Sequence, residues 1–128
     1  MNAIKSHIPA KTIVFVVDDE PMLLDLAVAV LESVGCEVRT FRNPELALKA
    51  FAAARPDVVV TDYSMGGMNG MDLIRECRRL NPGQKVILIS GTVDGEVFAD
   101  SPVKPDRFLA KPYQIEELTH CVRTLLPA

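Results

Sequence analysis

Acidic, hydroxyl and amine side chains directly follow four short apolar runs of this 128-residue sequence. The runs and the residues that follow them are Thr12–Val17 with Asp18 and Asp19, Asp57–Thr61 with Asp62, Lys85–Ile89 with Ser90, and Arg107–Ala110 with Lys111. Carboxylates are hard oxygen ligands that suit Mg²⁺. This ion usually keeps several water ligands and often binds phosphate oxygens. An ammonium and a hydroxyl can hold further phosphoryl oxygens, and a carboxylate can accept the phosphoryl group as a nucleophile. The set predicts a phosphoryl-transfer site if folding gathers these run ends.

Each of these residues also has an explanation that involves no chemistry. An aspartate shortly before Pro21 is a good helix N-cap, Asp62 can start a turn, Ser90 can cap a loop, and Lys111 can be a solvated charge. The coincidence of all of them at run ends favours one shared site. Crowded carboxylates repel one another and raise some pKa values unless a cation compensates. We therefore expect a bound Mg²⁺, with Mn²⁺ as the alternative ion.

The apolar runs predict strands that are buried on both faces of a parallel sheet. β-branched residues dominate Thr12–Val17, Asp57–Thr61 and Lys85–Ile89, and continuous apolar runs are typical of strands that helices cover on both sides. Glu37–Phe41 alternates polar and apolar residues, as an edge strand does, and Arg107–Ala110 is the candidate for the other edge.

The segments between the runs have helical spacing. A first helix begins at Pro21 and ends before Gly35, a second begins at Asn43-Pro44, and later ones span Met71–Leu80 and Gln114–Leu126. The stripes expected to face the sheet are Leu23, Leu26, Ala27, Val30, Leu31 and Val34 in the first helix and Leu46, Ala47, Ala50, Phe51 and Ala54 in the second.

Alternating strands and helices predict an α/β fold with a doubly wound, five-stranded parallel sheet. The flavodoxin-like strand order 2-1-3-4-5, with helices on both faces, fits this pattern and places ligands beyond the carboxyl ends of the strands. One helix is expected to be short or irregular. Glycines and prolines between Ser90 and Arg107 leave room for only about one or two turns around Glu96–Asp100.

Composition narrows the class of protein. The length fits one domain, which we place at residues 11–128 after a flexible extension at residues 1–10. A formal net charge of −3 argues against direct binding of nucleic acid or anionic membranes. The three cysteines are widely spaced and the sequence has no long apolar run, so we expect reduced thiols, no membrane span and a cytoplasmic location.

Four motifs in the sequence match those of a known protein family. The chain resembles the receiver domain of bacterial two-component response regulators from Lys11 to Leu126. The matching motifs are VVDDEP at Val16–Pro21, VVVTDYSMGGMNG at Val58–Gly70, ILISG at Ile87–Gly91 and FLAKPY at Phe108–Tyr113.

The resemblance implies a role for each site residue. Asp62 corresponds to the phosphoacceptor, which becomes an aspartyl phosphate. Asp18, Asp19 and Asp62 correspond to the Mg²⁺ ligands, together with the backbone carbonyl of Ser64. Lys111 corresponds to the lysine that pairs with Asp62 and then with the phosphoryl group, and its bond to Pro112 is expected to be cis. Ser90 and Phe108 correspond to the hydroxyl and the aromatic residue that move together on phosphorylation.

Three departures from the family pattern lead to further expectations. Gly66 and Gly67 replace the usual proline after Met65, so we expect a looser loop. The small Ser64 stands where side chains tune the lifetime of the phosphoryl group. The segment SPVKPD at Ser101–Asp106 predicts an unusual output surface beside the strand at Arg107–Ala110.

The resemblance also implies partners. The donor would be a sensor histidine kinase or a histidine phosphotransfer protein, docked partly on the first helix, where Met22 and Ala29 lie opposite the core stripe. A downstream protein effector would read the phosphorylated state. We expect no turnover of external substrates and no DNA-binding segment after the last helix, so the chain acts alone or belongs to a longer protein.

Three other functions remain open. An aspartyl-phosphate phosphatase would need a second acid two residues after Asp62, where Ser64 stands. A nucleotide or flavin binder would need an anion-binding loop where Asp18, Asp19 and Glu20 instead place negative charge. A receiver used only as a protein-binding scaffold would have no use for the full set of acids, hydroxyl and lysine.

Overall fold

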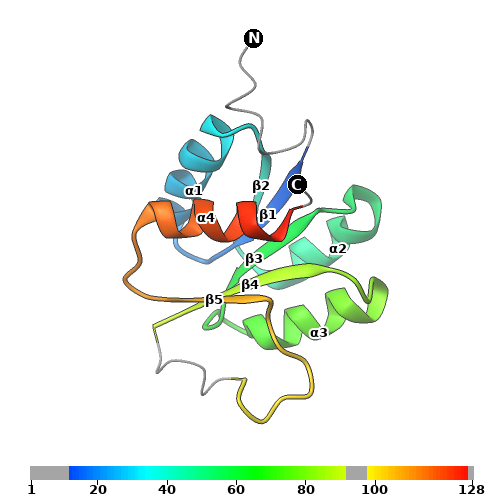
Figure 1. Cartoon of the computed structure of the whole chain (residues 1–128). Coiled ribbons are helices and arrows are strands. Elements are labelled where there is room, and N and C mark those ends of the chain that lie inside the picture. The colour runs from blue at the N-terminus through cyan, green and yellow to red at the C-terminus, as the bar shows by residue number, and fades with distance from the viewer. Residues whose placement is uncertain (1–11, 92–97, 127–128) are drawn as a thin grey trace.

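A single five-stranded parallel sheet forms the centre of the protein. The computed structural model describes residues 12–91 and 98–126, so the expected extension at residues 1–10 lies outside the described part. The strands run in the order β2-β1-β3-β4-β5, which confirms the predicted order (Figure 1). Their bounds are β1 Ile13–Val17, β2 Glu37–Phe41, β3 Val58–Asp62, β4 Lys85–Ser90 and β5 Arg107–Ala110.

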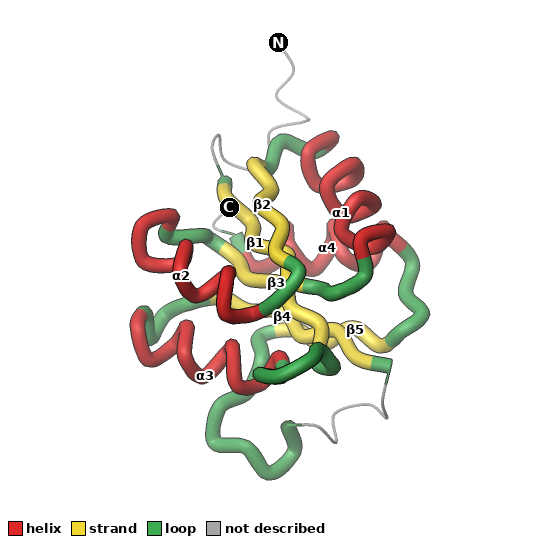
Figure 2. The backbone as a smooth tube through the Cα atoms, turned by 180° about the vertical axis from the view of Figure 1, so that it is seen from behind, coloured by secondary structure: helices red, strands yellow, loops and turns green. Residues whose placement is uncertain are grey.

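The described helices cover the two faces of the sheet in pairs. Their bounds are α1 Pro21–Ser33, α2 Pro44–Ala54, α3 Gly70–Leu80 and α4 Ile115–Leu125. Helices α1 and α4 lie on one face, and α2 and α3 lie on the other (Figures 1 and 2). None of the helices in residues 12–91 and 98–126 has the length and hydrophobicity of a transmembrane span.

The β-branched runs form the sheet because alternate side chains enter two separate cores. Val14, Val16 and Val58 pack beneath α1 and α4, whereas Phe15 and Val59 pack beneath α2 and α3. All five are at most 5% exposed. Full burial of an aliphatic side chain contributes about 1.5–3 kcal/mol, so the central strands β1 and β3 are held firmly from both sides. Their carboxyl ends provide a rigid base for polar residues.

The helices begin and end near their expected residues, but two leucines lie on the other side from the prediction. In α1 the buried residues are Leu24, Ala27 and Leu31, which share one helical face, whereas Leu26 is 48% exposed. In α2 the first leucine, Leu46, is likewise 48% exposed. The sequence does not show which face of each helix is buried, because leucines occur on more than one face of both helices.

The connection from β4 to β5 contains no helix within its described residues, 98–106. The expected short helix around Glu96–Asp100 lies partly outside the described residues, and Phe98–Asp100 forms a turn. The ammonium of Lys104 donates to the carbonyl oxygens of Phe98, Ala99 and Ser101 at 2.8–3.1 Å. These bonds fold the segment back on itself in place of a helix.

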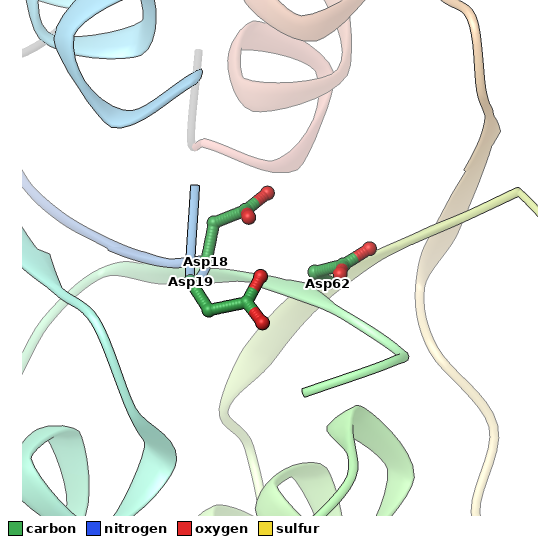
Figure 3. Close-up of side chains that lie close together, drawn as sticks. All are labelled: Asp18, Asp19 and Asp62. Carbon is green, nitrogen blue, oxygen red and sulfur yellow. The ribbon is translucent and has the colours of Figure 1, made fainter. Parts of the chain in front are cut away.

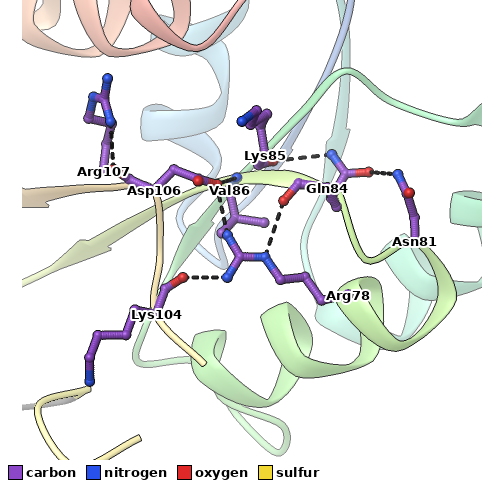
Figure 4. A network of polar contacts seen from close by, with 8 residues as sticks. All are labelled: Arg78, Asn81, Gln84, Lys85, Val86, Lys104, Asp106 and Arg107. Atoms are coloured by element: carbon purple, nitrogen blue, oxygen red, sulfur yellow. Dashed lines mark hydrogen bonds and ion pairs between the residues drawn. The ribbon is translucent and has the colours of Figure 1, made fainter. Parts of the chain in front are cut away.

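Arg78 of α3 fastens this segment to the sheet (Figure 4). Its guanidinium donates to the Lys104 carbonyl, to the Gln84 carbonyl at 3.2 Å and to Asp106 Oδ2 at 2.8 Å. Asp106 Oδ2 also accepts from the backbone N–H of Val86 at 2.8 Å. The side chains of Arg78 and Asp106 are each at least three quarters buried. Their ion pair and the bonds to the backbone therefore hold this connection in one place beside β5.

Gly70, the first residue of α3, lies against the end of β3. A Cβ added at this position would approach the Asp62 carbonyl oxygen to 2.5 Å and Tyr63 Cα to 3.0 Å. These are backbone atoms that cannot move without shifting the strand end. The absence of a side chain therefore allows the helix to start directly beside Asp62.

We expect Gly70→Ala to lower the free energy of unfolding by about 1–3 kcal/mol, the usual cost of overpacking. Urea unfolding followed by circular dichroism would measure the change. Gly83→Ala is the matched control, because its added Cβ would meet nothing within 4 Å. Equal midpoints for the two variants would contradict the close packing at Gly70.

Candidate functional site

Three carboxylates meet at the carboxyl ends of β1 and β3. Asp18 and Asp19 directly follow β1, and Asp62 is the last residue of β3. The two strands are neighbours in register, with Val17 opposite Thr61, so their ends lie level. One oxygen from each carboxylate lies within 4.8 Å of the others (Figure 3). Adjacent parallel strands therefore bring together acids that are 43 to 44 residues apart.

The three carboxylates differ in exposure. Asp18 and Asp62 are each only 4% exposed, whereas Asp19 is exposed. Asp18 Oδ1 accepts the backbone N–H of Glu20 at 2.9 Å, which fixes the turn into α1. The N-cap of α1 is Glu20, without a side-chain cap. A role in shaping the turn into α1 thus accounts for one carboxylate oxygen of Asp18. It does not explain the presence of Asp19.

Lys111 brings a positive charge to this group from beyond β5. Its ammonium lies 3.2 Å from Asp62 Oδ1 and 3.8 Å from Glu20 Oε1. Its backbone N–H donates to the Ser90 carbonyl at 2.9 Å, which extends the pairing of β4 with β5. The peptide bond from Lys111 to Pro112 is cis, as expected.

The other predicted site residues lie at the end of β4, in the loop after β3 and within β5. Ser90 ends β4, the strand beside β3, and is 1% exposed. Ser64 is exposed, two residues beyond Asp62. Phe108 of β5 is half-buried, and its ring centroid lies 5.6 Å from that of Phe98.

Burial, hydrogen bonds and neighbouring charges together shift the pKa values of the site residues. Burial raises the pKa of Asp18 to about 6, aided by the charge of Asp62 and opposed by the Glu20 N–H. Burial also raises the pKa of Asp62, although the hydrogen bond from Lys111 opposes this shift. Burial alone would lower the pKa of Lys111, but the hydrogen bond and charge of Asp62 outweigh burial and leave it raised. The amine therefore stays protonated, and it balances only part of the negative charge that the two buried acids carry when ionised.

The donor set fits a small hard cation. Three carboxylates that can converge on one ion, two buried and one open to solvent, suit Mg²⁺, which retains several water ligands. The ammonium of Lys111 contacts Asp62 without contacting the other two aspartates within ion-pair distance among the described residues. One carboxylate is thus placed between a metal site and a positive charge, where an incoming anion would be stabilised.

Sequence reasoning missed two contributors to this site. From the sequence, Glu20 stands out only as a further acid, yet its carboxylate lies 3.8 Å from the Lys111 ammonium. Tyr113 is half-buried beside the site. Both line a groove of about 410 Å³ whose other lining residues are Leu23, Leu26, Lys111, Pro112 and Ile115. The DDEP and KPY motifs contain these residues, but only the fold shows that α1 and the segment after β5 form one groove.

Comparison with known proteins agrees with this geometry. The family model for the response regulator receiver domain matches residues 14–123. The chain is 35% identical over 115 residues to the "Probable transcriptional regulatory protein TcrX" of Mycobacterium tuberculosis, covering 88% of this chain and 49% of the relative. The chain thus spans about half the length of that curated relative.

Two solved structures illustrate the likeness. The response regulator TrrA of Thermotoga maritima, in complex with Mg²⁺-BeF, is 30% identical with a TM-score of 0.79, covering 90% of this chain and 99% of that chain. The chemotaxis protein CheY4 of Vibrio cholerae shares the fold, with a TM-score of 0.85 at 24% identity, covering 91% of this chain and 100% of that chain. With a family match over most of its length, the chain belongs to the receiver domains of two-component response regulators.

Proposed function

We propose that this receiver domain accepts a phosphoryl group on Asp62 from a phosphohistidine of a sensor histidine kinase or histidine phosphotransfer protein. The observation that carries the proposal is the position of Asp62, within 4.8 Å of two further carboxylates and 3.2 Å from the Lys111 ammonium. A carboxylate in this setting is a nucleophile with a cation on either side once a metal is bound. Such positioning and charge stabilisation account for most catalysis of phosphoryl transfer.

In the proposed step, a carboxylate oxygen of Asp62 forms a bond to phosphorus while the bond from phosphorus to the histidine nitrogen breaks. The imidazole nitrogen keeps the electron pair of that bond and takes a proton from the solvent. Lys111 would stay protonated and hold a phosphoryl oxygen, since its ammonium already lies beside Asp62. The same residues would support loss of the group to water, without turnover of any external substrate.

The residues present fit a divalent cation, and we propose Mg²⁺, with Mn²⁺ as an alternative. Asp18, Asp19, Asp62 and the carbonyl of Ser64 would hold it. When bound, the ion neutralises charge on the transferred phosphoryl group. The donor chemistry of three convergent carboxylates supports this assignment, as does the Mg²⁺-BeF complex of TrrA.

The proposed output runs through Ser90 and Phe108. Ser90 lies buried at the end of β4, next to the strand that carries Asp62. In the proposed switch, its hydroxyl would move to a new phosphoryl oxygen. Phe108 packs on Phe98 of the segment that Lys104 folds back. A downstream protein would read this surface, which has no helix among residues 98–106.

Donor docking on α1 is supported by its exposed apolar residues. Met22 is 75% exposed and Leu26 is 48% exposed, and Ala29 is exposed as well. A cytoplasmic location remains a prediction, supported by three buried cysteines that form no disulfide.

We expect incubation with Mg²⁺ and acetyl phosphate to add one phosphoryl mass to the protein, because a small donor replaces the phosphohistidine. Intact mass spectrometry would measure the addition, which should disappear on removal of Mg²⁺ and in Asp62→Asn. Asp72→Asn, at the capping box of α3, is the control that keeps the label. Equal labelling of Asp62→Asn would show that another residue is the acceptor.

We expect the metal-free protein to lose stability as the pH rises from about 4 to about 6. The folded state binds the Asp18 proton more tightly, with a pKa of about 6 against about 3.9 in an unfolded chain. Ionisation through this window therefore lowers the free energy of unfolding, by about 3 kcal/mol.

Urea unfolding at several pH values, with and without Mg²⁺, would measure this loss. Asp18→Asn should remove the slope contributed by Asp18 and also most of the stabilisation by Mg²⁺ above pH ~6. Asp25→Asn, on an exposed position of α1, should keep both. An unchanged slope in Asp18→Asn would contradict the assignment of the raised pKa.

A further inference from the structure

Lys111 has a second carboxylate neighbour besides the proposed phosphoacceptor. Its ammonium lies 3.2 Å from Asp62 Oδ1 and 3.8 Å from Glu20 Oε1. The two acids differ in setting, because the Asp62 side chain is 5% exposed and that of Glu20 is 63% exposed. The ammonium thus lies between an inner acid at the site and an outer acid at its rim.

The backbone of Glu20 is fixed while its side chain has no role in the helix. Its N–H donates to Asp18 Oδ1 at 2.9 Å, so the residue is tied to the acidic group. Glu20 is the N-cap of α1, yet its side chain makes no capping bond. Lys111 is its ion-pair partner within the described residues.

The groove beside the site shields one partner of this ion pair from solvent. Glu20 and Lys111 lie at the charged side of the groove, and Leu23, Leu26 and Tyr113 line much of the rest. These apolar walls shield the ammonium, whereas water still screens the carboxylate of Glu20, whose side chain is 63% exposed. The Lys111 side chain is itself only 25% exposed.

We infer that Glu20 is a positioning residue that shares the Lys111 ammonium with Asp62 and so weakens its hold on a phosphoryl group. The inference rests on the proposed function. When Asp62 carries the phosphoryl group, Lys111 is drawn inward to the new oxygens, and Glu20 holds it outward. Glu20 would therefore set how strongly the phosphorylated state is favoured.

The test is the apparent dissociation constant of fluoroberyllate, a phosphoryl mimic, measured by titration of the whole chain in Mg²⁺. Glu20→Gln removes the outer competitor, so we expect binding to tighten about two- to fivefold, the range for a partly exposed ion pair. Glu32→Gln, which removes the same charge from an exposed position of α1, should bind as the wild type does.

Glu20→Asp distinguishes the effect of direct contact with Lys111 from the effect of a negative charge near the site. It keeps the negative charge but shortens the side chain by one methylene, which withdraws the carboxylate from Lys111. We expect it to bind fluoroberyllate as tightly as Glu20→Gln. Wild-type affinity in Glu20→Asp would overturn the positioning role, because the charge alone would then be responsible.

The remaining outcomes are equally decisive. Unchanged or weaker binding in Glu20→Gln would overturn the inference, and so would an equal change in Glu32→Gln. Wild-type protein that binds no fluoroberyllate and takes no label on Asp62 would overturn the proposed function itself. That failure is distinguishable, because it appears before any Glu20 variant is compared.

Discussion

The proximity of three carboxylates to one ammonium is the interaction on which the rest of this protein depends. Like charges placed within 4.8 Å of one another, two of them almost fully buried, are costly unless cations balance them. Lys111 supplies one positive charge, directed at Asp62. The proposed divalent ion would balance the remaining negative charge and so allow the proposed phosphoryl group to approach.

The sheet makes this arrangement possible by holding strand ends that are distant in sequence. β1 and β3 are packed from both faces, so Asp18, Asp19 and Asp62 have little freedom to move apart. Gly70 lets α3 begin directly against the Asp62 backbone. On the other side, β5 is kept in place by the ion pair that joins its preceding residue, Asp106, to α3. Because the sheet is held rigidly, we expect any conformational change to occur in the loops.

Much of the fold and the acidic site could be predicted from sequence, because β-branched runs identify buried parallel strands and the residues after them must share one edge. The buried face of α1 could not be predicted, because leucines occur on several of its faces. Only packing against the sheet selects Leu24 over Leu26 as a buried residue. The contact of Glu20 with Lys111 depends on how the turn into α1 is held. The structure of residues 98–106 depends on the long-range bonds of Arg78, which no local pattern reveals.

A crystal structure of the protein grown with Mg²⁺ and fluoroberyllate would show whether the three aspartates and Lys111 act together on a phosphoryl group. We expect beryllium bonded to a carboxylate oxygen of Asp62, the metal bound by that group together with Asp18 and Asp19, and the Lys111 ammonium in contact with a fluorine. Fluoroberyllate bound elsewhere, or a Lys111 side chain turned away from Asp62 in the loaded site, would contradict this expectation.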